Sequence, residues 1–258
     1  MKISLVLGGL ILVTSLSAQY TDKDAAPPPP PKPNPSAIQP QQAPPVFFFN
    51  VNAGVGQPIG GYSVNGCAST GGNLSVVAGL PFNRRIAIAF KFDYGWNSID
   101  QLQFLDSVLK ESNVPGLQLS FPTKPDSYTY EAFMIGINST HQFQQCAIGS
   151  RFFIGDMFAT IPALTLKGVY PTGQVQIITT TAATGQALTL DLGVFFKYNA
   201  QPDLAFTISI DYIYGNASFT DLQYSAPTAP QQVFSALNFD VGLEYTVFGS
   251  TSGPGKGH

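Results

Sequence analysis

Eight charged residues lie in segments of regular alternation, where they could meet in one place. They are Lys91, Asp93, Arg151, Asp191, Lys197, Asp211, Asp240 and Glu244. Two carboxylates held together can act as general acid and general base, so a pair such as Asp93 and Asp211 could support catalysis. The cations Lys91 and Arg151 give those carboxylates another role, because charges withdrawn from water must be paired or solvated. We therefore expect an ion-pair network with trapped water at these positions.

The segments that carry these charges alternate between apolar and polar side chains. Along residues 188–198 and 204–214 one face is apolar and ends in tyrosines, and the opposite face carries Asp191, Lys197 and Asp211. Each run has eleven residues, and a polar turn of five residues joins the two. Eleven residues at about 3.3 Å each and a tilt of roughly 40° rise about 28 Å, close to the roughly 25 Å apolar band of a transmembrane barrel. The pattern predicts membrane-crossing strands whose charges face inward.

Alternation after residue 45 gives eight such strands. They are predicted at residues 46–57, 73–80, 85–96, 128–138, 146–158, 188–198, 204–214 and 236–247. Connections after even-numbered strands are short and those after odd-numbered strands are long, as in barrels with short inner turns and long outer loops. We therefore predict an all-β fold, an eight-stranded antiparallel up-and-down transmembrane β-barrel over residues 46–248. The phase of the fourth strand turns Glu131 outward near the rim.

The last predicted strand has a pattern of its own. It runs from the polar Asp240 through Gly242 and the aromatic Tyr245 to Val247. Val247 stands where such patterns usually end on an aromatic residue, and the aromatic Phe248 follows it directly. With the strand pattern over residues 46–248, the chain resembles the small eight-stranded outer-membrane proteins, a group that includes the OmpA-type transmembrane domain and the outer membrane protein beta-barrel domain family. The resemblance implies that the barrel-assembly machinery reads this C-terminal signal. It also implies residence in the bacterial outer membrane, in contact with its lipid and lipopolysaccharide.

Histidine and cysteine give little support for nucleophilic chemistry. His141 falls in a predicted inner turn and His258 at the end of the chain, so neither could serve a hydrolase whose site faces outward. Cys67 is predicted in an outer loop and Cys146 at the inner end of a strand, so we expect both to be unpaired. The sequence has no metal-ligand cluster, P-loop or dinucleotide fingerprint. We expect no enzyme activity and no cofactor.

The two ends of the chain differ from the barrel pattern. Residues 1–18 have the charged, apolar and small-residue order of a signal peptide. Residues 19–45 are rich in proline and predict an extended periplasmic linker, either a bare spacer or an arm that contacts a periplasmic partner. Residues 249–258 are expected to form a flexible tail.

Composition narrows the function classes. Only 10% of the residues are charged, against about 25% in ordinary soluble domains. A soluble protein with so few charges would be hard to keep dispersed. The net charge of −3 leaves no basic face to neutralise phosphates, so nucleic acid is not an expected partner.

The long outer loop at residues 97–127 contains apolar residues three to four apart. They are Ile99, Leu102, Leu105, Val108 and Leu109. This spacing predicts an amphipathic helix over residues 99–112, with Ser98 as N-cap and Pro115-Gly116 as the stop. Its apolar side either packs over the barrel mouth and neighbouring loops or forms a surface for a partner or for lipopolysaccharide acyl chains. In a second outer loop, residues 164–169 and 174–180 either extend the flanking strands or form a hairpin.

These patterns favour an integral outer-membrane barrel with a structural or surface-binding role through its outer loops. An eight-stranded barrel is just wide enough for its own side chains, so no wide pore is expected. Within it, Lys197 and Glu244 should lie close enough near the inner end to form an ion pair, either directly or through a bridging water. Two alternatives remain: an accessory subunit of an outer-membrane secretion or assembly complex, and a secreted barrel that binds a lipophilic ligand. The secreted barrel needs apolar residues inside, which is the reverse of the last three strands.

Overall fold

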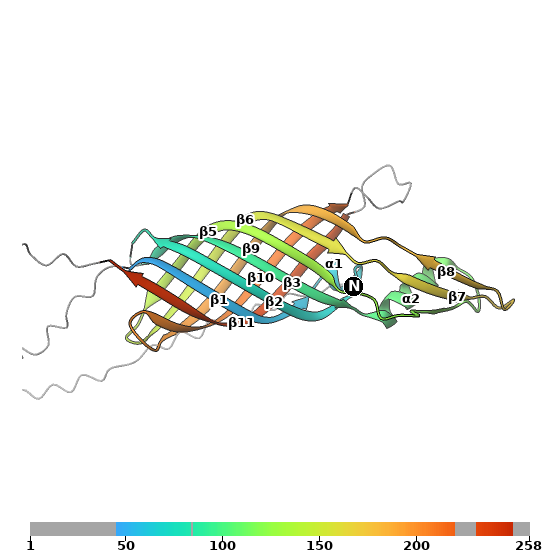
Figure 1. Ribbon diagram of the computed structural model, residues 1–258, viewed down its shortest axis with the longest axis horizontal. Coiled ribbons are helices and arrows are strands. Elements are labelled where there is room, and N and C mark those ends of the chain that lie inside the picture. Colours follow the sequence, from blue (N-terminus) through green and yellow to red (C-terminus); the bar gives the residue numbers. More distant parts are fainter. Residues whose placement is uncertain (1–44, 84, 220–230, 250–258) are drawn as a thin grey trace, which may run out of the picture. The chain divides into compact units, whose positions relative to one another are not determined.

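Eight long strands close into a barrel. The computed structural model describes residues 45–83, 85–219 and 231–249 of the 258-residue chain. The barrel order is β1-β11-β10-β9-β6-β5-β3-β2, and every neighbouring pair is antiparallel (Figure 1). The strands are β1 (Pro45–Pro58), β2 (Ala68–Pro81), β3 (Ile86–Ile99), β5 (Tyr128–Gln142), β6 (Cys146–Ile161), β9 (Ala183–Asn199), β10 (Leu204–Phe219) and β11 (Gln231–Phe248). The predicted eight-stranded up-and-down barrel is confirmed.

Three of the predicted segments lie at the chain ends. Almost all of their residues lie outside the described part of the chain. They are the signal peptide at residues 1–18, the linker at 19–45, of which only residue 45 is described, and the tail at 249–258, of which only residue 249 is described. These assignments remain predictions.

The strands run further than the apolar alternation indicates, on the side of the long loops. β2 starts at Ala68, β9 at Ala183 and β11 at Gln231, each five residues before the predicted start, and β10 continues to Phe219. The backbone ladder persists there, but outward positions such as Gln186 are polar. An apolar outer face is required only where the wall meets hydrocarbon, so alternation in hydropathy ends before the strand does.

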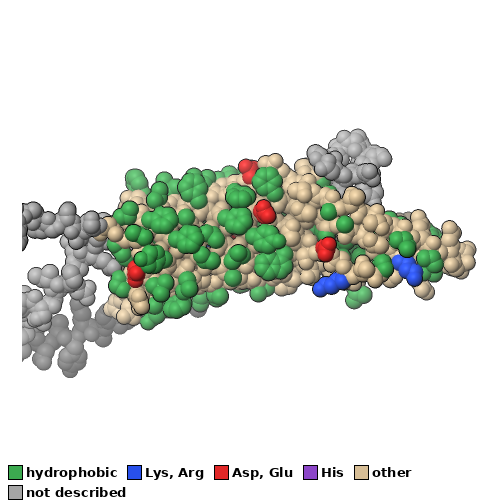
Figure 2. All heavy atoms as spheres, viewed as in Figure 1, with side chains coloured by type: hydrophobic (Ala, Val, Ile, Leu, Met, Phe, Trp, Pro, Cys, Tyr) green, Lys and Arg blue, Asp and Glu red, His purple; other side chains and the backbone are tan. Residues whose placement is uncertain are grey.

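The barrel wall is apolar outside and polar inside. On β10, Phe206, Ile208 and Ile210 are 52, 57 and 43% exposed, and the intervening Thr207 and Ser209 are each 3% exposed. Figure 2 shows hydrophobic side chains covering the wall on the face in view. A mainly apolar exterior around a closed ladder is the arrangement of a barrel that spans a membrane.

The phase of the fourth predicted strand also holds. Glu131 faces outward and is exposed, and the pairing of β5 with both neighbours runs without a register shift.

The outer connections carry further structure. They hold two helices, α1 (Gly61–Val64) and α2 (Gln101–Ser112), and a separate three-stranded sheet of β4 (Gln118–Ser120), β7 (Thr165–Val169) and β8 (Val175–Thr179). β7 and β8 form a hairpin, which is one of the two arrangements predicted for that loop. We call α2 with this sheet the outer lobe. Among the described residues, neither helix is long and apolar enough to cross a membrane.

The helix α2 starts two residues later than predicted. Its N-cap is Asp100, whose carboxylate accepts a hydrogen bond from the Gln103 N–H at 3.1 Å. Ser98 and Ile99 belong to β3, because the β2 to β3 ladder continues to the pair Ala68 and Ile99. The predicted N-cap at Ser98 is therefore wrong. Aspartate caps a helix as well as serine does, and cross-strand pairing decides between them.

We expect Ile208→Arg to destabilise the folded barrel by roughly 2 to 4 kcal/mol, because the charge would face hydrocarbon near the bilayer midplane. The same change at Phe90, which is 58% exposed on the opposite part of the wall, should act alike. Urea unfolding in lipid vesicles measures this cost. Thr123→Arg, on an exposed outer loop, is the control and should change stability by less than about 0.5 kcal/mol. Equal effects at Ile208 and Thr123 would contradict the assignment of the faces.

Candidate functional site

The structure places all eight predicted charged residues in the lumen. They come from five strands, β3, β6, β9, β10 and β11, and none is more than 9% exposed. Five of them form a central group of ion pairs, namely Lys91, Asp93, Arg151, Asp191 and Asp211, and Lys197 and Glu244 form a separate pair nearer the inner end. Asp240 makes no ion pair with the described residues and accepts a hydrogen bond from Asn73 instead, so the expected network holds for seven of the eight positions. Residues remote in sequence therefore meet because the wall brings inward positions of different strands to similar depths.

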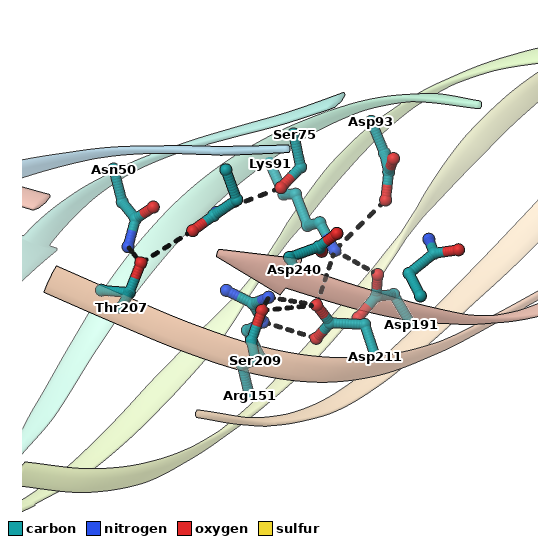
Figure 3. A network of polar contacts seen from close by, with 12 residues as sticks. Asn50, Ser75, Lys91, Asp93, Arg151, Asp191, Thr207, Ser209, Asp211 and Asp240 are labelled. Atoms are coloured by element: carbon teal, nitrogen blue, oxygen red, sulfur yellow. Dashed lines mark hydrogen bonds and ion pairs between the residues drawn. The ribbon is translucent and has the colours of Figure 1, made fainter. Parts of the chain in front are cut away.

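Lys91 is at the centre of the network. Its Nζ lies 2.5 Å from Asp191 Oδ2, 3.2 Å from Asp93 Oδ2 and 3.7 Å from Asp211 Oδ2. Figure 3 shows these three carboxylates converging on one ammonium group from β3, β9 and β10. The acid pair considered for catalysis, Asp93 and Asp211, thus shares a cation, as expected of an ion-pair network.

Arg151 reaches across one strand to bind Asp211. Its Nε donates to Asp211 Oδ1 at 2.6 Å, and its Nη2 donates to the other carboxylate oxygen and to Ser209 Oγ, the latter at 2.8 Å. In register, Arg151 faces Gly193 on β9, and Gly193 faces Asp211 on β10. A Cβ on Gly193 would overlap Asp211 Oδ1, so a side chain at this position would have to displace the Asp211 carboxylate.

Gly193 is a site residue that was not predicted from the sequence. The available signal was a glycine inside a strand that otherwise alternates regularly, which often marks a close approach.

The predicted ion pair of Lys197 and Glu244 is present. Lys197 Nζ lies 2.5 Å from Glu244 Oε2 and 2.7 Å from Oε1. The ammonium also lies over the rings of Phe48 and Phe195, at 5.1 and 4.9 Å from their centroids. β9 and β11 flank β10, as the strand order requires.

Neutral amides complete the lumen, and sequence analysis missed them. They are Asn50, Asn52, Asn73, Asn97, Asn138 and Asn238, each at most 5% exposed. Asn73 Nδ2 donates to Asp240 Oδ1 at 2.7 Å, and Asn52 Nδ2 donates to Ser75 Oγ at 3.1 Å. The sequence signal for these residues is their alternation with outward apolar residues, since neutral amides carry no charge that would mark them.

Aromatic side chains fill the outer mouth. Tyr62 of α1 is fully buried, with its ring centroid 4.7 Å from that of Phe234 and 5.7 Å from that of Tyr128. Its hydroxyl donates to Asn97 Oδ1 at 3.3 Å. Burial raises the pKa of the Tyr62 hydroxyl well above its ordinary value, so this group stays a neutral donor. These aromatic side chains form a plug at the outer mouth, and the ionic network lies deeper in the lumen.

The predicted partner surface on α2 is only partly exposed. Ile99 is buried in β3, and Leu105, Val108 and Leu109 are half-buried, which leaves Leu102 at 81% exposure. The helix also packs through Phe104, whose ring centroid lies 5.7 Å from that of Phe121. The burial of these residues favours the packing alternative for α2, and Phe104 and Phe121 pack against the buried core. A partner surface on α2 remains a prediction, with Leu102 as its exposed member.

Exposed apolar residues of the outer lobe gather instead on β8. Val175, Ile177 and Ile178 are 53, 65 and 47% exposed. The run itself was predictable from the sequence, but its exposure was not, because period-two alternation is the same in a covered and an uncovered strand.

The remaining predicted site residues also have clear positions. Both cysteines are free, with Cys67 buried in an outer loop and Cys146 at the inner start of β6. Burial raises the pKa of the Cys67 thiol, which disfavours the reactive thiolate. His141 is exposed at the inner end of β5, and His258 lies outside the described residues. Within residues 45–83, 85–219 and 231–249, no three His, Cys, Asp or Glu side chains are placed to hold a metal ion.

The proposed assembly signal lies on β11, the strand that closes the barrel against β1. Tyr245 and Val247 face outward, and Asp240 faces the lumen. A Cβ on Gly242 would lie 2.2 Å from Asn52 Oδ1, so this glycine also has a packing role. Phe248 is the last residue of the strand, and recognition of the set by the assembly machinery remains a prediction.

Comparison with known proteins gives a likeness in fold. No protein-family model and no curated protein matches the chain. Neisserial surface protein A is 11% identical, with a TM-score of 0.40 over 78% of this chain and 97% of its own. A major outer membrane protein from Thermus thermophilus is 15% identical, with a TM-score of 0.41 over 78 and 100%. The outer membrane protease OmpT from Escherichia coli is 10% identical, with a TM-score of 0.38 over 81 and 99%.

Such low identities and TM-scores transfer no activity to this chain. The likeness is to small outer-membrane barrels in general, and membership of the OmpA-type group stays a prediction.

We expect Gly193→Ala to destabilise the barrel by about 1 to 3 kcal/mol, because the added methyl group forces Asp211 away from Arg151. Urea unfolding followed by the fluorescence of Trp96, the single tryptophan, measures the change. The matched control is Gly61→Ala, where the nearest atom to the new Cβ is 3.6 Å away. A Gly193→Ala barrel as stable as the Gly61→Ala barrel would show that the close approach is not required.

Removal of one partner from the inner pair should cost more than removal of both. Lys197→Met leaves the buried Glu244 carboxylate without its cation, and we expect a loss of about 3 to 5 kcal/mol. The double variant with Glu244→Gln should recover at least half of that loss. The same unfolding assay gives the coupling, and additive effects of the two changes would rule out a direct interaction.

Proposed function

We propose that the chain is an integral protein of the bacterial outer membrane, in which a closed and filled barrel carries the outer lobe as a binding surface. The observation that carries this proposal is that the wall has apolar residues outside and a charged network inside, which is the inverse of the arrangement in a soluble protein. Lipid is the surrounding in which that inversion is favourable. Closed antiparallel barrels of this size are typical of outer membranes, and the predicted signal peptide supports export.

Transport through a wide pore receives no support from the lumen. The aromatic plug around Tyr62 occupies the outer mouth, and Lys91 and Arg151 tie strands together across the centre. An eight-stranded barrel has little room beyond its own side chains. The barrel is therefore better suited to anchor a surface structure in the membrane than to conduct a solute.

The outer lobe is what the barrel holds. It has its own helix cap, sheet and aromatic contact between Phe104 and Phe121, so it is an ordered surface rather than a bare connection. It also carries the exposed side chains of Leu102 and Ile177. Exposed apolar groups on an ordered scaffold favour a surface-binding role over a purely structural one.

A non-catalytic role is part of the proposal. Asp211 is bound by Arg151 through both carboxylate oxygens, and Asp93 lies beside Lys91, so both acids of the pair considered for catalysis are ion-pair partners. A lipophilic ligand would need an apolar lumen, whereas the described centre is polar. The alternative of an accessory subunit in a secretion or assembly complex rests on the proline-rich arm. A pull-down with and without residues 24–45 tests this alternative, which requires that a periplasmic partner is captured only when those residues are present.

An epitope tag should be accessible at one end of the barrel only. A tag inserted after Gly173, at the tip of the β7 to β8 hairpin where a Cβ would meet no atom within 4 Å, should bind antibody on intact cells. The matched tag after residue 201, in the short turn between β9 and β10, should bind only after lysis. Both proteins should keep heat-modifiable migration in the membrane fraction. Surface exposure of the inner-turn tag, or loss of the protein to the soluble fraction, would overturn the proposal.

A further inference from the structure

The strand β8 has an open edge. It is the last strand of the sheet β4-β7-β8, and within the described residues no strand pairs with its outer side. All five of its residues are exposed. Open edges that lack charge, proline or a bulge are ready to pair with another strand.

The hydrogen-bonding groups on this edge can be identified from the hairpin. Tyr170 N–H donates to Gln174 O, and Thr180 N–H donates to Leu164 O, so the even-numbered residues of β8 bond to β7. Backbone groups alternate sides along an antiparallel strand. The N–H and C=O groups of Val175, Ile177 and Thr179 therefore point to the open side.

The strand β8 and the residues on either side of it carry no charge. Residues 168–190 contain no Asp, Glu, Lys or Arg. Two identical strands that pair around a two-fold axis bring each residue near the axis close to its own copy, so any charge there would meet a like charge. The open edge of β8 carries no charge and so avoids that repulsion. Lys167 lies one strand back, paired with Ile177 in the β7 to β8 ladder.

We propose that β8 pairs with β8 of a second copy of this chain, antiparallel and centred on Ile177. This pairing rests on the proposed function, because it names the partner of the outer lobe. Ile177 then faces Ile177 of the second copy, and Val175 faces Thr179, so each of these residues exchanges two backbone bonds. The two Lys167 side chains are three strand spacings apart, about 14 Å, which exceeds the screening length of about 8 Å.

The direction of β8 sets the geometry of the pair. β7 and β8 run along the barrel's long direction beyond its outer end (Figure 1). An antiparallel partner strand runs the opposite way, so its barrel points back toward the first. The two copies therefore lie in two facing membranes, and the pairing joins those membranes.

The expected strength follows from size. A pair of five-residue strands buries less than the roughly 1,000 Å² typical of a stable interface, so the protein should be monomeric in dilute detergent. Many copies on two membranes act together, which multiplies a weak contact.

From Ile177 to Leu188, at the outer end of the apolar belt on β9, eleven residues span at most about 36 Å. Joined membranes should therefore lie no more than about 70 Å apart.

The test uses the full chain in phosphatidylcholine vesicles labelled with two dyes of different colour. Trypsin cleavage of the outer lobe in an aliquot checks that the lobe lies on the outside of the vesicles. Wild-type vesicles should cluster, and electron tomography should show the short membrane gap. Ile177→Lys and Ile177→Glu should each reduce clustering at least tenfold, because like charges meet at the axis. A mixture of Ile177→Lys vesicles with Ile177→Glu vesicles should cluster again, because opposite charges now meet there.

The matched control is Gln118→Lys, which adds the same charge to β4 at the other edge of the same sheet and should leave clustering unchanged. Wild-type vesicles that stay dispersed, although the protein is heat-modifiable and its lobe is accessible, would overturn the pairing and leave the barrel proposal standing. Clustering of Ile177→Lys vesicles at the wild-type level, or failure of the mixed vesicles to cluster, would also overturn it. A protein that does not insert would overturn the proposed function as well.

Discussion

Backbone hydrogen bonding in hydrocarbon is the constraint on which the rest of this structure depends. No N–H or C=O group in the wall can bond to water there, so the sheet must close, and β1 closes it by pairing with β11 from Pro58 to Pro45. Closure fixes the register of every strand. Register then decides which side chains face lipid and which meet inside, so the lumen network is a product of the wall rather than a separate element.

The interior shows how a narrow barrel accommodates charge. Lys91 contacts carboxylates from three strands, and Lys197 binds Glu244 beneath two aromatic rings. Each ionic contact is sheltered, so an unpaired charge would carry a large desolvation cost. Amides such as Asn73 fill the positions between them. The network therefore holds strands from opposite parts of the wall together, which suits an anchor better than a conduit.

Sequence patterns predicted the features that follow from the two-residue period of a strand. They failed for features that depend on cross-strand pairing or on tertiary packing. The faces of β10 and the pairing of Lys197 with Glu244 follow from alternation and strand order, and both were predictable. The start of α2 was not, because a cross-strand pair retains Ile99 in β3. The exposure of Ile177 was also hidden, since covering depends on tertiary packing.

The position of Gly193 has a consequence for how the barrel is assembled. Arg151 reaches Asp211 only where the residue between them has no side chain, and Gly193 occupies that place in one register alone. A shift of β9 by two residues would keep its faces but would put Asp191 or Phe195 in the gap. Hydropathy cannot detect such a shift, because lipid-facing residues would still face lipid. The ion pair thus distinguishes the correct strand alignment from others that the membrane would accept equally.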